Sequence, residues 1–128
     1  MGLFTQDLHS LQSLIDEQAT VRGRFITTTN LRVDGTVEGD IEAGEAPQGP
    51  QSCVVIGSSG RVFGDIRAFR VVVAGRVDGH IYATEKVILE KGAHIKGDIT
   101  YDALEVQQPI SHQGMLISRG KGVEAVNL

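Results

Sequence analysis

The side chains in this sequence that could carry out acid–base or metal chemistry are few and scattered. The histidines are His9, His80, His94 and His112, and a zinc site would need several of them to face one another. His80 follows Val-Asp-Gly, and in similar sequences elsewhere in the chain an aspartate stands at this position. His94 occupies a different place in its own motif. The two therefore do not converge, and surface histidines are the better interpretation. We expect no catalytic residues and no metal site.

The carboxylates and the cysteine give no stronger indication of chemistry. Asp40, Asp65 and Asp98 each stand between a glycine and an isoleucine. Such a series could weakly bind a cation, but solvated carboxylates at turns are more common. Cys53 is the one cysteine, and no His or Cys adjoins it in sequence, so we expect a buried small apolar residue. Because the sequence also lacks a phosphate-binding glycine loop, we expect no cofactor and no nucleotide.

These residues belong to a sequence unit that occurs four times, and this repeat predicts the architecture. The units approximate Gly-x-Val-x-Gly-Asp-Ile, and a short aliphatic run precedes each of them. Their second glycines are Gly39, Gly64, Gly79 and Gly97, spaced by 15 to 25 residues. A unit this short cannot bury a face alone, so the units must stack on one another as a solenoid.

Apolar and polar residues alternate within each unit, as they do in a β-strand. Val33, Val37 and Ile41 are separated by polar residues, and glycines mark the corners. We therefore predict an all-β, single-stranded β-helix of about five to six coils with three strands in each coil. Four inward columns of aliphatic residues follow from aligning the units: Leu31, Val54, Val71, Val87 and Leu104; Val33, Ile56, Val73, Leu89 and Val106; Val37, Val62, Val77 and Ile95; and Ile41, Ile66, Ile81 and Ile99.

The repeat also indicates domain boundaries. We predict a β-helix over residues 20–117, with flexible tails over 1–19 and 118–128. The first tail alternatively forms a short amphipathic helix, because Phe4, Leu8, Leu11 and Ile15 fall on one helical face. Residues 44–52 are rich in Gly and Pro and interrupt the repeat, so we interpret them as a loop that bulges from one coil.

The repeated Gly-x-Val-x-Gly-Asp-Ile units, each after a Leu-x-Val strand, resemble those of the bactofilins, the bacterial polymer-forming cytoskeletal proteins. The resemblance covers about residues 20–112. It implies a right-handed triangular β-helix and a homopolymer that forms without nucleotide. It also implies a non-enzymatic scaffold associated with the membrane, which positions proteins of cell shape or of cell-wall synthesis and hydrolysis. The sequence departs from the family pattern in the loop at 44–52, at His80, and in one extra residue before Ile95.

Composition limits the remaining function classes. The chain has 128 residues and a formal net charge of −4, which disfavours nucleic-acid binding. The lone cysteine and the absence of a secretory signal suggest the cytoplasm, and the resemblance implies the inner membrane surface. Aliphatic runs are too short to span a membrane. The alternative function is a small β-helix enzyme of the acyltransferase or carbonic anhydrase type, which would form discrete trimers where a scaffold would form filaments.

Three groups of apolar residues are candidate contact sites. Open strand edges at the ends of a solenoid favour self-association, so we expect a charge at Leu104 or Ile117 to prevent polymerisation without unfolding the chain. The membrane candidates are Leu3, Phe4 and Leu8, although residues 1–19 contain no Lys or Arg to attract anionic lipid and could instead cover the first coil. The polymerisation candidates are Val21, Phe25, Leu104, Val106, Ile110, Met115, Leu116 and Ile117, and the candidates for a lateral or partner face are Val55, Val72 and Ile88.

Overall fold

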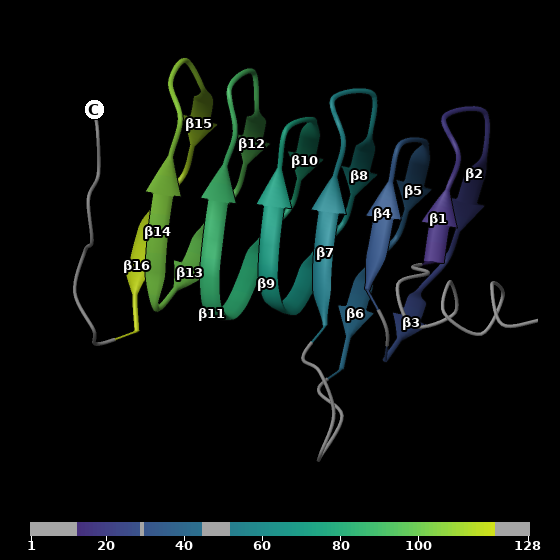
Figure 1. Cartoon of the computed structure of the whole chain (residues 1–128), viewed down its shortest axis with the longest axis horizontal. Coiled ribbons are helices and arrows are strands. Elements are labelled where there is room, and N and C mark those ends of the chain that lie inside the picture. The colour runs from purple at the N-terminus through teal and green to yellow at the C-terminus, as the bar shows by residue number, and fades with distance from the viewer. Residues whose placement is uncertain (1–12, 29, 45–51, 120–128) are drawn as a thin grey trace, which may run out of the picture.

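The chain winds into a three-sided β-helix. The computed structural model describes residues 13–28, 30–44 and 52–119, and these ranges contain sixteen strands and no helix. Every strand pairing is parallel, and each coil contributes one strand to each of three faces (Figure 1). In Figure 1 the near strands run upward and the far strands run downward as the chain advances from right to left, so the winding is right-handed. The predicted fold class is confirmed.

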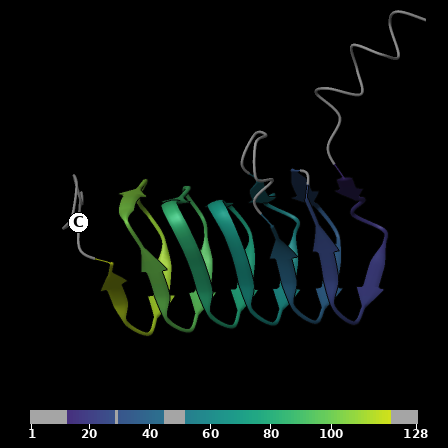
Figure 2. The same cartoon turned by 90° about the horizontal axis from the view of Figure 1, so that it is seen from below.

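Each face is a row of six parallel segments, one from each coil, and the coils lie side by side along the long axis (Figure 2). The first face contains β1 (Ser13–Ile15), β4 (Leu31–Val33), β7 (Cys53–Ile56), the second half of β9 (Ile66–Val73), the second half of β11 (Ile81–Leu89) and β14 (Ala103–Val106). The second face contains β2 (Thr20–Arg22), β5 (Thr36–Glu38), β8 (Arg61–Phe63), β10 (Arg76–Asp78), β12 (His94–Lys96) and β15 (Ser111–Gln113). The third face contains β3 (Phe25–Thr27), β6 (Ile41–Ala43), the first halves of β9 and β11, β13 (Ile99–Tyr101) and β16 (Leu116–Ser118).

The core consists of aliphatic columns that run along the axis of the helix. The strand registers confirm the four predicted columns, because each member pairs with the next coil's member. Burial of each such side chain contributes roughly 1.5–3 kcal/mol, which offsets the entropy cost of ordering the coils. A fifth buried set, not predicted from the sequence, lies two residues after each inward isoleucine: Ala43, Ala68, Ala83 and Tyr101.

One corner of the triangle requires glycine. Gly39 and Gly64 have φ angles of 151° and 157°, which lie in the region that favours glycine. A Cβ on Gly64 would lie 2.2 Å from the carbonyl oxygen of Gly39, and a Cβ on Gly39 would lie 2.1 Å from that of Gly23. The recurring second glycine of the sequence unit therefore permits successive coils to approach closely at this corner.

The predicted insertion lies between β6 and β7, at the corner between the third and first faces. The Ser52 hydroxyl donates a 2.6 Å hydrogen bond to the carbonyl of Gly44, and Ser52 is buried. The Gly44 N–H donates to the carbonyl of Thr27 on the preceding coil. These bonds fix both ends of the insertion at the wall of the helix, so the columns on either side remain in register. Residues 45–51 lie outside the described residues.

The β-helix begins earlier than the sequence indicated. Ser13–Ile15 form β1 and pair in register with Leu31–Val33, and Ile15 is buried. The structure therefore moves the start of the coils from residue 20 to Ser13 and places strand, not helix, at residues 13–15. At the other end β16 extends to Ser118, and Arg119 bonds to the coil before it. Residues 1–12 and 120–128 lie outside the described residues.

Candidate assembly surfaces

The N-terminal end of the helix, formed by β1, β2 and β3, is an open edge. Each of these strands pairs with one neighbour within the described chain. Val21 and Phe25, both predicted interface residues, point inward and are half-buried, because no coil precedes them in the described part of the chain. Leu14 and Ile26 point outward and are 60% and 65% exposed. We call this the N-terminal end surface; its apolar side chains, and strand edges with which no second described strand pairs, suit a second chain.

The C-terminal end of the helix, formed by β14, β15 and β16, is the second open edge. Each strand pairs with one neighbour among the described residues. The predicted interface residues differ in burial on this C-terminal end surface. Leu104 and Val106 are already buried, at 1% and 6% exposure, and Ile110 is half-buried. Leu116 and Ile117 are 43% and 38% exposed, and Met115 is 64% exposed.

This difference changes the choice of variant that would test the interface. Leu104 pairs with Val87 and belongs to the core cluster. A charge at Leu104 would therefore unfold the last coil rather than prevent assembly alone, contrary to the expectation from the sequence. Leu116 aligns with Ile99 at the end of an inward column but remains partly accessible, so it reports on assembly more directly.

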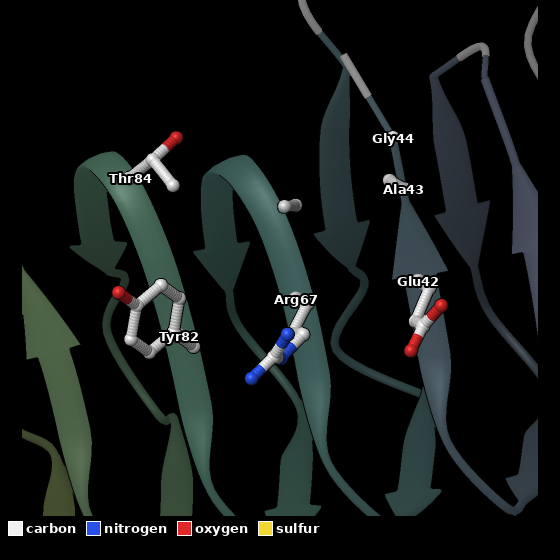
Figure 3. Close-up of a pocket in the computed structure, with 7 residues that line it drawn as sticks. Glu42, Ala43, Gly44, Arg67, Tyr82 and Thr84 are labelled. Carbon is white, nitrogen blue, oxygen red and sulfur yellow. The ribbon is translucent and has the colours of Figure 1, made fainter.

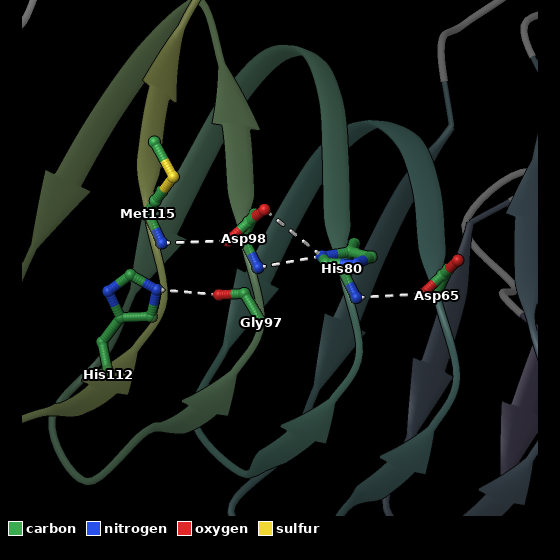
Figure 4. Close-up of polar contacts among 6 residues, drawn as sticks. All are labelled: Asp65, His80, Gly97, Asp98, His112 and Met115. Atoms are coloured by element: carbon green, nitrogen blue, oxygen red, sulfur yellow. Dashed lines mark hydrogen bonds and ion pairs between the residues drawn. The ribbon is translucent and has the colours of Figure 1, made fainter.

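A polar residue ends one inward column at the same surface. His112 takes the position that Ile95 has on the preceding coil. Its Nε2 lies 3.0 Å from the carbonyl oxygen of Gly97 (Figure 4), so this nitrogen carries the hydrogen and donates. The His112 ring thus donates a hydrogen bond to a backbone carbonyl at the open end. The C-terminal end surface therefore contains this polar side chain together with the apolar Leu116 of the same coil.

A ladder of side chains links successive coils along the corner between the second and third faces. The Asp65 N–H donates to Asp40 Oδ1 (2.9 Å), and the His80 N–H donates to Asp65 Oδ1 (3.0 Å). The Asp98 N–H donates to His80 Nδ1 (2.9 Å), and the Met115 N–H donates to Asp98 Oδ1 (3.0 Å), as Figure 4 shows in part. These aspartates are therefore structural acceptors for the next coil, a role that the sequence analysis did not identify.

His80 fits the ladder because its Nδ1 accepts a hydrogen bond as an aspartate oxygen would. Its place in the aspartate column, expected from the sequence, is confirmed. With Nδ1 as acceptor, the ring hydrogen is on Nε2. The repeated Gly-Asp-Ile motif was the available signal for this ladder, since a short acceptor at a fixed place in each turn commonly bonds to backbone N–H groups.

The predicted lateral column lies on the first face. Val55, Val72 and Ile88 are in register on adjacent strands and are half-buried. Arg32 precedes the column and Glu105 follows it. The column is therefore a strip of aliphatic side chains on the outer surface, with one charge at each end.

Cys53 lies beside this strip and is only half-buried, so the expectation of a fully buried cysteine is wrong. It pairs in register with Arg70. Burial raises the pKa of the Cys53 thiol above its ordinary value of 9.0, and the Arg70 guanidinium partly opposes this effect. The thiol is therefore protonated at neutral pH and less reactive than the thiol of an exposed cysteine.

A shallow recess lies on the third face, between side chains of successive coils. Arg67 and Tyr82 project from adjacent coils beside it, and Glu42 borders its N-terminal side (Figure 3). The arginine carbon Cζ lies 5.3 Å from the centre of the Tyr82 ring. This arrangement pairs a cation with an aromatic ring and contains no nucleophile–base pair. Within residues 13–28, 30–44 and 52–119, no group of three or more His, Cys, Asp or Glu side chains could bind a metal ion.

The predicted membrane residues Leu3, Phe4 and Leu8 lie outside the described residues. The chain enters the fold at Ser13, whose N–H bonds to Asn30 at the corner between the third and first faces. Among the described residues, no helix is long and apolar enough to cross a membrane.

A family model described as bactofilin, polymer-forming cytoskeletal, matches residues 13–116. The chain belongs to the bactofilin family. It is similar to bactofilin BacO of Myxococcus xanthus (strain DK1622), with 29% identity over 102 residues, which cover 80% of this chain and 75% of the relative. No solved structure matched the chain. The bactofilin match begins at Ser13, where β1 begins, and it indicates a cytoskeletal protein that associates with itself.

Proposed function

We propose that this bactofilin is a cytoskeletal scaffold whose filaments grow by end-to-end stacking of six-coil β-helices without nucleotide. The observation that carries this proposal is the pair of open ends. Six strands, three at each end, have one partner each among the described residues, and apolar residues lie at both edges. An unpaired edge with apolar side chains favours pairing with another chain, and a second chain would continue both the backbone ladders and the inward columns.

Stacking would bury the residues that the fold leaves uncovered. Among the described residues, no coil precedes Phe25 and Val21, and none follows Leu116. Each end contact would also pair three strand edges at once, which supplies directional hydrogen bonds in addition to apolar burial. In this proposal, apolar burial and strand pairing at the interface supply the driving force for assembly.

Electron microscopy of purified protein in buffer without nucleotide tests the proposal. Filaments whose mass rises with protein concentration support end-to-end stacking. Particles of fixed size at every concentration, as a trimeric enzyme would give, contradict it.

We propose that the scaffold lies in the cytoplasm, at the periphery of the inner membrane. Support comes from the apolar residues Leu3, Phe4 and Leu8 and from the bactofilin resemblance. Many copies along a filament would convert weak insertion of each tail into firm binding. Deletion of residues 1–12, which spares β1, should leave filaments intact and release them from liposomes. Loss of filaments with retained lipid binding would show that these residues belong to the filament interface and are not the membrane anchor.

The strip of Val55, Val72 and Ile88 is proposed as the lateral or partner face. Filament growth would repeat this half-buried strip indefinitely, and a contiguous apolar patch that remains accessible marks an interaction site. Its partner is a second filament or a protein of cell-wall synthesis or hydrolysis. The Val72→Lys variant should form single filaments, since this side chain points away from the core, but should bundle or recruit less. Bundling and recruitment at the level of the parent protein would remove this face from consideration.

A further inference from the structure

The last strand of the fold is held by a side chain that reaches back across two coils. β16 is an edge strand that pairs with β13 alone among the described strands, and its Leu116 and Ile117 are partly exposed. Arg119 follows it directly. The N–H of Arg119 donates a 2.7 Å hydrogen bond to the carbonyl of Tyr101 on the fifth coil. The backbone therefore stays attached to the wall of the helix one residue beyond the strand.

The side chain of Arg119 makes three further contacts. Its Nη1 donates a 3.0 Å hydrogen bond to the carbonyl of Thr84 and lies 3.8 Å from Asp102 Oδ1. Its guanidinium lies 5.6 Å from the centre of the Tyr82 ring. Tyr82 and Thr84 come from the fourth coil, so the arginine spans two coil spacings, about 10 Å along the axis.

The arrangement is specific to arginine. A planar guanidinium can donate to a carbonyl and stack on an aromatic ring at the same time, which a lysine ammonium cannot do with the same geometry. The Tyr82 ring has a second guanidinium over it, that of Arg67 from the third coil, at 5.3 Å. Arg67, Tyr82 and Arg119 thus form a row along the third face that ends at the C-terminal end surface.

We propose that Arg119 is a positioning residue for assembly, which fixes β16 against the preceding coils so that the C-terminal end surface is ordered before a second chain arrives. This inference rests on the proposed end-to-end stacking. Ordering an edge in advance lowers the entropy cost of association. Without Arg119, β16 would be ordered only when the next chain binds, and each end contact would weaken.

The decisive comparison is between Arg119→Ala and Arg67→Ala in the full-length chain. Both variants remove a guanidinium from the Tyr82 ring, but only the first removes a contact of the sixth coil. We expect Arg119→Ala to raise the critical concentration for polymerisation about tenfold, as a loss of about 1.4 kcal/mol per contact would. Arg67→Ala should change it less than twofold, and Arg119→Lys should lie between the two.

Amide hydrogen exchange separates positioning from a general loss of stability. In Arg119→Ala, exchange should accelerate at residues 116–118 and remain as in the parent protein at β4 and β7. Tyr82→Ala should reproduce the exchange change at 116–118. Unchanged critical concentration and exchange in Arg119→Ala would overturn the role of Arg119 while leaving end-to-end stacking intact. Failure of the parent protein to polymerise would instead overturn the proposed function.

Discussion

Leu116 offers the sharpest test of the C-terminal end surface. It aligns with Ile99 at the end of an inward column and is 43% exposed in the single chain. Full burial of a leucine side chain contributes about 1.5–3 kcal/mol, so covering the exposed part would contribute about 1 kcal/mol to each contact. The variant Leu116→Asp loses this contribution and also places an unpaired carboxylate in the contact, at a cost of about 3 kcal/mol or more.

Together these effects weaken each contact by about 4 kcal/mol, which raises the critical concentration about a thousandfold. The cost to the fold is smaller, about 1–2 kcal/mol, because only part of the side chain is buried in the single chain. Phe63→Asp is a matched control, since Phe63 is 41% exposed but lies on β8 in the middle of the helix.

Sedimentation velocity measures assembly, and circular dichroism measures folding. We expect Leu116→Asp to remain folded as monomers or small oligomers at concentrations where Phe63→Asp and the parent protein form filaments. Filaments of Leu116→Asp at the parent protein's critical concentration would refute the reasoning that places this residue in the contact. Loss of filaments in both variants would show that surface charge, and not the end contact, governs assembly.

Three further predictions concern the fold. Gly64→Ala should lower the free energy of unfolding by several kcal/mol and the melting temperature with it, because a Cβ would lie 2.2 Å from a backbone oxygen; an unchanged melting temperature would contradict the close approach of the coils. Asp65→Ala should cost about 0.5–1.5 kcal/mol by chemical denaturation, since the exposed His80 N–H loses its hydrogen-bond acceptor, while Asp65→Asn should cost less; equal losses would show that charge and not the ladder matters. Cys53 should react with iodoacetamide more slowly than a free thiol at pH 8, and more slowly still in Arg70→Ala, because burial raises the pKa of the thiol and Arg70 lowers it. The protonated thiol's contribution to the free energy of unfolding is fully present below pH 9.0, the ordinary value, and is lost as the pH rises from there through the higher pKa of the native thiol. Faster alkylation than that of a free thiol would contradict the burial.

The columns of the core could be predicted from the sequence because they depend on a short-range repeat. Val37, Val62, Val77 and Ile95 stand at the same place in successive units, and parallel pairing in register follows once the units stack. The first strand could not be found in this way. Ile15 fits a helical face with residues of the N-terminal segment, and a three-residue strand shows too little alternation to compete with that pattern.

The contacts that fix the ends depend on the winding itself. Arg119 and Thr84 are 35 residues apart, and nothing in their local sequences indicates that they meet. The sequence shows Asp65 and His80 at equivalent places in a repeated motif. It does not show that the two residues are hydrogen-bonded, because that depends on the backbone N–H of one coil lying beside the side chain of the coil before it. The structure also shows that Leu104 is buried whereas Leu116 is partly exposed. This difference is not apparent from the sequence, in which the two leucines look equivalent.

The measurement that tests end-to-end stacking most directly is the axial rise per subunit in filaments, obtained by electron cryomicroscopy or fibre diffraction. Six coils at a strand spacing of about 4.8 Å occupy about 29 Å, so stacked helices should show this rise together with an uninterrupted strand repeat along the filament. A rise far from this value, or strands that run along the filament axis, would contradict the claim that the open ends of the β-helix form the polymer.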